Sequence, residues 1–161
     1  MSIIFKGIEL INIAIGIEGR GVAFYEVMAR STGNATARDV FQHLADMERQ
    51  HIQIFQEMLK EADKYQVPES IAEEYASYFQ VLIDSAVFTD DFITSEMANQ
   101  VSSDVEALEL AMSAEKESIL FYYEMRDIMP RRASPVVNGI INEEKSHLRQ
   151  LSELKKKLAA I

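Results

Sequence analysis

The strongest constraint on this chain is a pair of short Glu-x-x-His motifs. Glu48 precedes His51 in the first motif, and Glu144 precedes His147 in the second. In an α-helix, residues three apart lie on one face and about 4.5 Å apart along the axis, so each motif directs a carboxylate and an imidazole to one point. A single motif of this kind is usually a solvated ion pair, so its meaning depends on the residues around it.

Both motifs lie within apolar helical faces, where a solvated ion pair is not expected. Hydrophobic residues recur at steps of three and four in the two surrounding segments, which predicts amphipathic helices. The first face comprises Phe41, Leu44, Met47, Glu48, His51, Phe55, Met58 and Leu59. The second comprises Ile140, Ile141, Glu144, His147, Leu148, Leu151 and Leu154. We therefore expect both motifs to point into a hydrophobic core.

An internal repeat pairs each motif with a further glutamate. A shift of 96 residues superimposes the first motif on the second. A shift of 97 superimposes Glu18 on Glu115 and Phe24-Tyr25 on Phe121-Tyr122. Each half is thus predicted to be a helical hairpin with a glutamate on one helix and the motif on the next. Two such hairpins packed face to face would bring four carboxylates and two imidazoles to a shared centre.

These patterns predict an all-α fold, a four-helix bundle with a long, partly helical crossover between the second and third helices. We expect one domain over residues 1–161, with helix hairpins at about 4–64 and 103–159. The predicted helices cover residues 4–31, 35–64, 103–129 and 135–159. The connection, about 65–102, should hold a helix over 71–85 and a helical turn near 93–99. Its length allows the third helix to run parallel to the second.

Local signals mark three of the helix starts. Asn34 is the expected N-cap of the second helix, because its side chain can accept a hydrogen bond from the first turn. Ser103 with Glu106 has the spacing of a capping box before the third helix. Ser134 followed by Pro135 predicts an N-cap and a first helical residue for the fourth.

Charge and composition exclude several classes of function. The net charge is −10 and the only basic run is 155–157, so we expect no nucleic acid partner. The absence of cysteine excludes disulfides, thiolate metal sites and an iron–thiolate electron relay in this sequence. The apolar run 8–17 is interrupted by Glu9 and Asn12 and is too short to span a bilayer. We therefore expect a core helix there, no membrane partner and a cytoplasmic protein.

The four glutamates of the shared centre call for cations. Ionised carboxylates in an apolar core repel one another and lose their hydration, so without metal they would have to take up protons. Two divalent ions balance the four charges, and two ferric ions with one oxo bridge balance them again. One imidazole per metal among oxygen ligands suits iron or manganese, whereas zinc often takes more nitrogen or sulfur ligands. We therefore expect two iron ions, with manganese or zinc as possible substitutes. The expected ligands are Glu48 and Glu144 as bridges, Glu18 and Glu115 as terminal carboxylates, and His51 and His147.

Several nearby residues allow two interpretations each. Tyr25 and Tyr122 follow their glutamates by seven residues on one helical face, with Tyr123 as a rival to Tyr122. They either fill the core or hydrogen-bond a ligating carboxylate and supply a proton or an electron. Three glycines around Glu18 either pack against a neighbouring helix or leave space for a small ligand: Gly16, Gly19 and Gly21. The leftover histidine, His43, is expected at the surface.

The aromatic residues of the connection also have two interpretations. They either cap the bundle or form a dimer surface: Tyr75, Tyr78, Phe79, Phe88 and Phe92.

Taken together, these residues resemble the ferritin-like di-iron domain of rubrerythrins. The resemblance rests on Glu18, Glu48-x-x-His51, Glu115, Glu144-x-x-His147, Tyr25 and the segment 114–122, and it covers nearly the whole chain. It implies a ferritin-like bundle whose two iron ions, as Fe2+ or Fe3+, reduce hydrogen peroxide or dioxygen. It also implies a homodimer.

The chain departs from the rubrerythrin pattern at two points. Without cysteine it has no iron–thiolate domain, so we expect electrons from an external donor such as a rubredoxin-like protein. Rubrerythrins also carry a further glutamate three residues after the third-helix ligand, which exchanges with a histidine as the iron changes redox state. Ser118 stands at that position, so we expect His51 and His147 to stay bound in both states.

Three other functions remain open at this stage. One is iron binding and storage, as in ferritin cages. Another is a manganese catalase-like enzyme, which uses similar ligands. The third is a plain helical bundle that acts as a binding or coat component.

Overall fold

Four long helices dominate the structure, a computed structural model that describes residues 6–93 and 97–160. They are α1 (Gly7–Ser31), α2 (Ala35–Lys60), α5 (Asp104–Ile128) and α6 (Ser134–Ala159). The connection holds α3 (Glu69–Asp84) and α4 (Met97–Gln100), and two 3-10 turns, η1 (Ala62–Tyr65) and η2 (Arg131–Ala133), join neighbouring helices. The described residues include no strand. The all-α prediction is confirmed.

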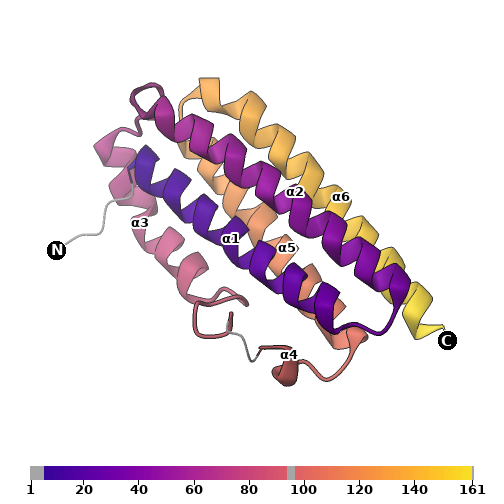
Figure 1. Cartoon of the computed structure of the whole chain (residues 1–161). Helices are drawn as coiled ribbons and strands as arrows, with labels where there is room; N and C mark the ends of the chain where they lie inside the picture. The colour runs from indigo at the N-terminus through magenta and orange to yellow at the C-terminus, as the bar shows by residue number, and fades with distance from the viewer. Residues whose placement is uncertain (1–5, 94–96, 161) are drawn as a thin grey trace.

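The long helices form two hairpins that pack face to face. Helices α1 and α2 form the first hairpin, α5 and α6 form the second, and α2 also contacts α6 while α1 contacts α5. In Figure 1, α2 and α5 run in the same direction, because the connection carries the chain back along the bundle before α5 begins. Helix α3 packs against α5 on the way. The predicted crossover between the second and third helices is therefore confirmed.

Of the three predicted N-caps, one is confirmed, one is confirmed in part and one is wrong. The Asn34 side chain accepts a hydrogen bond from the Ala37 N–H at 2.9 Å, as expected. Ser103 Oγ accepts from the Glu106 N–H, but the Glu106 carboxylate accepts from the Ser102 N–H, one residue before the cap. The prediction of Ser134 as an N-cap is wrong. The η2 turn continues directly into α6, so Ser134 is already helical.

The second helix ends at Lys60, four residues earlier than predicted. The chain then tightens into η1, which brings the Tyr65 carbonyl group against the first turn of α1. A Cβ atom at Gly7 would collide with that carbonyl oxygen, so glycine permits the close approach. Residues 4 and 5, expected in the first helix, lie outside the described residues, as do 94–96 of the expected turn near 93–99.

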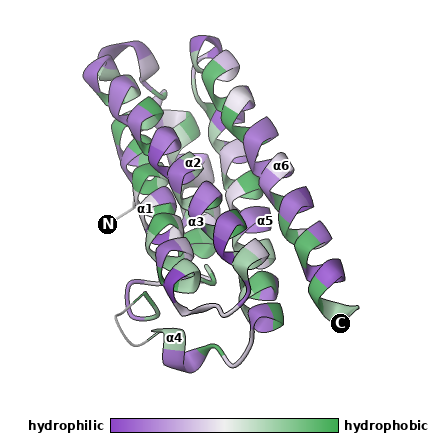
Figure 2. Ribbon diagram, turned by 45° about the vertical axis from the view of Figure 1, so that its right-hand side comes forward, coloured by the Kyte–Doolittle hydropathy of each residue, from purple (hydrophilic) through white to green (hydrophobic). Residues whose placement is uncertain are grey.

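The apolar core is divided into two clusters, one toward each end of the bundle. One cluster includes Leu10, Phe55 and Ile140, and the other includes Phe41 and Leu108. Along each long helix in Figure 2, green hydrophobic stretches alternate with purple hydrophilic ones, as expected for helices with one buried face. Among residues 6–93 and 97–160, seven buried residues are polar or charged, and all but Thr32 belong to the predicted metal site. The polar layer therefore lies within the hydrophobic core.

Aromatic residues of the connection cap the bundle. Phe79 is fully buried and its ring meets Phe121 edge-on, with the centroids 5.3 Å apart. Phe88 stacks on Phe24 at 4.4 Å. Tyr78 is 38% exposed on α3. The capping interpretation thus holds for Phe79 and Phe88.

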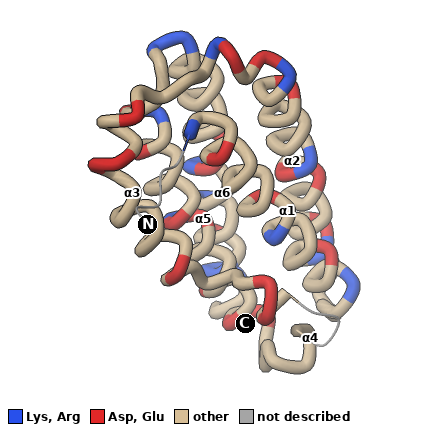
Figure 3. Tube along the Cα trace, turned by 90° about the vertical axis from the view of Figure 1, so that its left-hand side faces the viewer, with Lys and Arg blue, Asp and Glu red and all other residues tan. Residues whose placement is uncertain are grey.

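Charged residues cover the outside of the bundle without a single basic face. Figure 3 shows lysine and arginine interspersed with aspartate and glutamate. All the charged residues of α3 are acidic. None of the described helices combines the length and apolar character that crossing a bilayer requires.

Candidate metal centre

All six predicted ligands meet inside the bundle. Helices α1 and α5 each contribute one glutamate, and α2 and α6 each contribute a complete motif. Every one of these residues is at most 3% exposed: Glu18, Glu48, His51, Glu115, Glu144 and His147. The helical period that placed each residue on an apolar face therefore also brings the four faces to one centre.

The six residues form two overlapping groups of four. Within each group, one ligand atom per residue lies within 4.8 Å of the others. The first group is Glu18, Glu48, His51 and Glu144, and the second is Glu48, Glu115, Glu144 and His147. Glu48 and Glu144 belong to both groups, which is the arrangement that two bridging carboxylates require. The outer carboxylates Glu18 and Glu115 belong to one group each.

The imidazoles face the carboxylates through the same ring atom. His51 Nδ1 lies 3.0 Å from a Glu144 oxygen and 3.2 Å from a Glu48 oxygen. His147 Nδ1 lies 3.2 Å from the other Glu144 oxygen and 3.4 Å from the other Glu48 oxygen. The two rings are nearly parallel, with centroids 5.6 Å apart. Each Nδ1 is therefore in position to bind an ion that the carboxylates also bind.

Unpaired carboxylate oxygens support the fit of cations to this centre. Glu115 Oε2 is buried and receives no hydrogen bond from the described residues, and the buried Glu144 Oε1 has His51 Nδ1 at 3.0 Å, an atom that would itself bind the ion. A buried acceptor without a donor costs about 1–3 kcal/mol, and more when it is charged. A metal ion would remove that cost, because it replaces the missing donor with a coordination bond. The donor set of four carboxylates and two imidazoles suits hard and borderline divalent ions such as iron and manganese.

Crowding of the carboxylates perturbs their protonation. Burial, followed by the charges of neighbouring carboxylates, raises the pKa of Glu48, Glu115 and Glu144 well above the ordinary value. Burial also raises the pKa of Glu18, but hydrogen bonds from Glu48, His51 and Tyr122 outweigh it and lower that pKa to about 2.

Protons thus occupy the centre when metal does not. Burial alone would lower the pKa of His51 and His147, but the surrounding carboxylates outweigh it and raise both values. Since ligands must lose these protons to bind a cation, metal and protons compete for the same atoms.

The two tyrosines are hydrogen-bonded to the outer carboxylates in a crossed arrangement. Tyr25, on α1, donates to Glu115 Oε1 on α5 at 2.5 Å. Tyr122, on α5, donates to Glu18 on α1. Both phenols are buried, and burial together with the nearby carboxylates raises the pKa of each. Each tyrosine therefore holds its proton and orients a carboxylate of the opposite hairpin.

The rings of these tyrosines also fill the core, so the two interpretations are not exclusive. Tyr25 stacks near Phe41, with centroids 6.2 Å apart. Tyr123 is no rival at the centre, because its hydroxyl accepts from Lys145 and its ring lies under the Arg126 guanidinium. The remaining histidine, His43, is exposed, as predicted.

A cavity of about 170 Å³ adjoins the centre between α1, α5 and the end of α3. Its inner wall includes Glu18, Glu48 and Glu115, and most of the remaining wall is apolar. Gly21 lines it, and a Cβ atom there would lie 3.6 Å from Glu48 Cγ. The nearest atoms to a Cβ at Gly16 belong to Arg20 of the same helix, and at Gly19 there are none within 4 Å. Gly21 therefore both borders the cavity and lies at ordinary contact distance from α2, whereas Gly16 and Gly19 do not pack against a neighbouring helix and do not line the cavity.

Sequence reasoning missed two parts of this site. The outer wall of the cavity comes from residues 82–88 of the connection, and Glu117 fixes that segment by accepting the Val87 N–H at 3.0 Å. The second is Glu143, whose carboxylate lies 2.5 Å from His51 Nε2. The doubled glutamate at 143–144 was a signal in the sequence, but only the packing of α6 on α2 shows its partner.

Ser118 lines the cavity and donates a hydrogen bond from its hydroxyl group to the Ala114 carbonyl group.

Comparison with known proteins agrees with this geometry. The rubrerythrin family model matches residues 9–155. The chain belongs to the rubrerythrin family. A solved structure from Thermotoga maritima, described as a ferritin-like diiron-carboxylate protein, is 33% identical and has a TM-score of 0.71. The match covers 95% of this rubrerythrin-family chain and 96% of that one. Comparison with curated proteins gives no match.

Family membership agrees with the interpretation of the buried cluster as a di-metal site. The predicted resemblance to rubrerythrins and the ferritin-like fold are confirmed. The overlapping groups of carboxylate and imidazole ligands match what a di-metal site requires.

Proposed function

We propose that this rubrerythrin-family protein is a di-iron oxidoreductase that reduces hydrogen peroxide or dioxygen with electrons from a separate protein. The observation that carries the proposal is the sharing of Glu48 and Glu144 between the two ligand groups. In this assignment Glu48 and Glu144 would serve both metal positions. Glu18 and His51 complete one position, and Glu115 and His147 complete the other. Two bound iron ions supply Lewis acidity and the electrons for cleavage of an oxygen–oxygen bond.

The surrounding residues support a small neutral oxidant as substrate. Peroxide reduction consumes two electrons and two protons and releases two waters. The cavity reaches Glu18, Glu48 and Glu115, and its volume of about 170 Å³ suits a molecule as small as peroxide or dioxygen. Most of the remaining lining is apolar, with Arg20 and Glu117 as its charged members. Tyr25 and Tyr122 hold protons at their hydroxyl groups beside the outer carboxylates. They keep those carboxylates oriented and hold protons within reach of the reaction.

Electrons come from outside in this proposal, because the chain has no cysteine for an iron–thiolate relay. A rubredoxin-like protein is a donor of suitable chemistry. The serine at position 118 brings no carboxylate to the cavity. His51 and His147 would therefore hold the ions in both oxidation states.

Stopped-flow oxidation of the ferrous protein tests the proposal. Anaerobically loaded protein mixed with peroxide should oxidise its iron faster than ferrous iron in buffer. H51A and H147A should remove most of that rate, whereas H43A should leave it unchanged, because His43 is exposed and distant from the centre. A wild-type rate equal to that of buffer would show that the centre does not perform this reaction.

Manganese is the one substitute that the donor set favours to a similar degree, since carboxylate oxygens with one imidazole suit it as well as iron. A manganese centre would make the protein catalase-like. Metal analysis of protein produced without added metal, together with oxygen release from peroxide, separates the two. Iron in the protein and no oxygen release support the iron proposal.

A further inference from the structure

The two imidazoles differ at the nitrogen that faces away from the carboxylates. His51 Nε2 lies 2.5 Å from a Glu143 oxygen, so it donates its proton to a carboxylate. His147 Nε2 is buried, and none of the described residues forms a hydrogen bond with it. The six ligands are related by a near two-fold symmetry, but the partners of the two Nε2 atoms are not.

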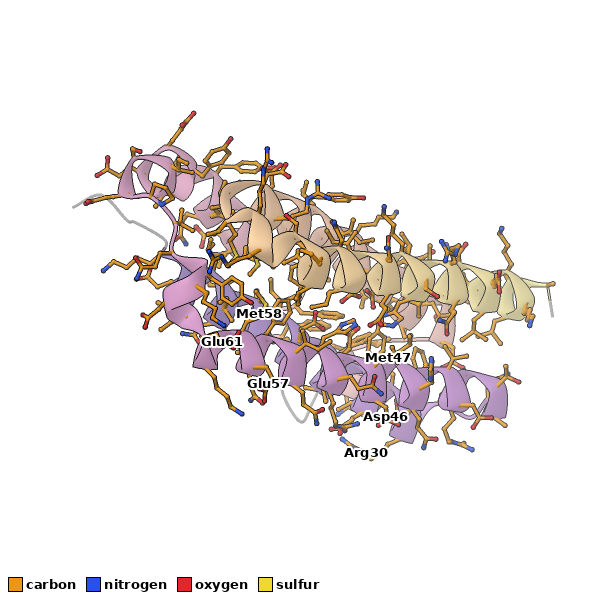
Figure 4. The ribbon with its side chains drawn as sticks, turned by 90° about the horizontal axis from the view of Figure 1, so that it is seen from above. Arg30, Asp46, Met47, Glu57, Met58 and Glu61 are labelled. Carbon is orange, nitrogen blue, oxygen red and sulfur yellow. The ribbon has the colours of Figure 1, made fainter. Side chains whose placement is uncertain are left out.

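The internal repeat shows where the symmetry is lost. Glu143 immediately precedes Glu144 on α6 and reaches across to His51 on α2. The same shift of 96 residues that relates the two motifs places Met47 of α2 at the matching position. Figure 4 labels Met47 on α2, with α6 running alongside. A thioether is only a weak acceptor, so Met47 cannot replace a carboxylate as the partner of a ring N–H.

A carboxylate behind an imidazole changes how that imidazole binds a cation. It holds the proton on Nε2, which leaves the Nδ1 lone pair free, and it fixes the orientation of the ring. It also increases the electron density on the ring and makes Nδ1 a stronger donor. His51 has all three advantages and His147 has none of them. The Glu143 side chain is 46% exposed, so the bond is formed at the edge of the core.

We propose that Glu143 is a positioning residue that makes the two metal positions inequivalent, so that the position held by Glu18 and His51 fills first. This inference rests on the proposed di-metal site. Loss of such an outer partner typically weakens metal binding about 10- to 100-fold. We expect a difference of that size between the two positions, with the weaker ion at Glu115 and His147.

Calorimetric titration of the metal-free protein with Co2+, a redox-stable probe for ferrous iron, tests the inference. Wild-type protein should bind two ions in steps separated by about 10- to 100-fold. E143Q should weaken the tighter step by a similar factor and bring the two steps together. M47E should strengthen the weaker step, and M47Q, which is closer to methionine in charge, should do so to a smaller extent.

The control variant is E153Q, which removes the same charge from an exposed position on α6. It should bind as the wild type does. Two ions that share bridging carboxylates influence each other, so separate steps alone do not show inequivalent positions. If E143Q leaves the separation between the two steps as large as in the wild type, or weakens both steps equally, the inference is wrong.

Half-loaded crystals provide a direct assignment. With one equivalent of Co2+, anomalous scattering should show one ion beside His51. Equal peaks beside both histidines, or a stronger peak beside His147, would refute the inference. Failure of wild-type protein to bind any ion would instead contradict the proposed di-metal function itself.

Discussion

Removal of the metal should reverse the way in which the stability of this protein depends on pH. In the metal-free protein, burial raises the pKa of Glu48, Glu115 and Glu144 above the ordinary value of 4.5. The folded state then holds protons that the unfolded state has released. For such groups the stabilisation is complete below the unfolded pKa and is lost as pH rises toward the folded pKa. His51 and His147, whose pKa values are also raised, act in the same direction above their ordinary value of 6.5.

The slope follows from the number of extra protons. Each proton that the folded state retains and the unfolded state has lost changes the free energy of unfolding by about 1.4 kcal/mol per pH unit. One such proton lowers the melting temperature of a domain of this size by about 3–5 °C per pH unit. The three carboxyl groups together contribute at most about 4 kcal/mol per pH unit, and the two histidines add to this slope above pH 6.5. Glu18 adds nothing between pH 5 and 8, because its lowered pKa leaves it ionised in both states.

The metal-loaded protein should show the opposite trend, since cations bind the deprotonated ligands and add their binding free energy to folding. Urea or thermal unfolding between pH 5 and 8, with and without a chelator, measures both slopes. E115Q mimics the protonated carboxyl group, so it should reduce the slope of the metal-free protein, whereas the exposed E153Q should not. A metal-free protein whose stability rises with pH over this range would refute the reasoning.

Three further predictions concern single side chains. Y122F removes the donor to the buried Glu18 carboxylate and should cost about 1.5–3 kcal/mol in unfolding experiments on the metal-free protein, whereas Y123F, outside the centre, should cost much less. G19A should stabilise the protein by about 1 kcal/mol, because a Cβ there meets no atom within 4 Å and alanine favours helix; a loss of stability would contradict that reading. G7A should destabilise it by about 1–3 kcal/mol, because the Cβ collides with the Tyr65 carbonyl group; an unchanged melting temperature would show that η1 moves aside freely.

The helix ends show where prediction from sequence is weakest. Periodicity placed the four long helices correctly, yet α2 stops at Lys60 instead of continuing to residue 64. The residues after Lys60 are compatible with a helix, but the η1 turn packs Tyr65 against the start of α1 instead. Ser134 failed as a cap for a similar reason, because the η2 turn leads directly into α6. Local propensity is a weak preference that such packing readily overrides.

The ligand set, in contrast, could be predicted from the sequence, because each ligand occupies a position that the helical spacing places on a buried face. The three-residue interval, the apolar faces and the repeat together identify which four helices carry which six polar residues. Their convergence then follows from burial, since polar groups on buried faces must meet partners.

Only the tertiary structure shows which residue forms a hydrogen bond with which metal ligand. The sequence by itself determined the helices, the buried faces and the six polar residues between them, because these depend on spacing along one helix. The crossed pairing of Tyr25 with Glu115, the cavity beneath residues 82–88 and the contact of Glu143 with His51 depend on how helices from different hairpins are rotated and shifted against each other. That rotation is set by the packing of the whole core, so no short motif records it.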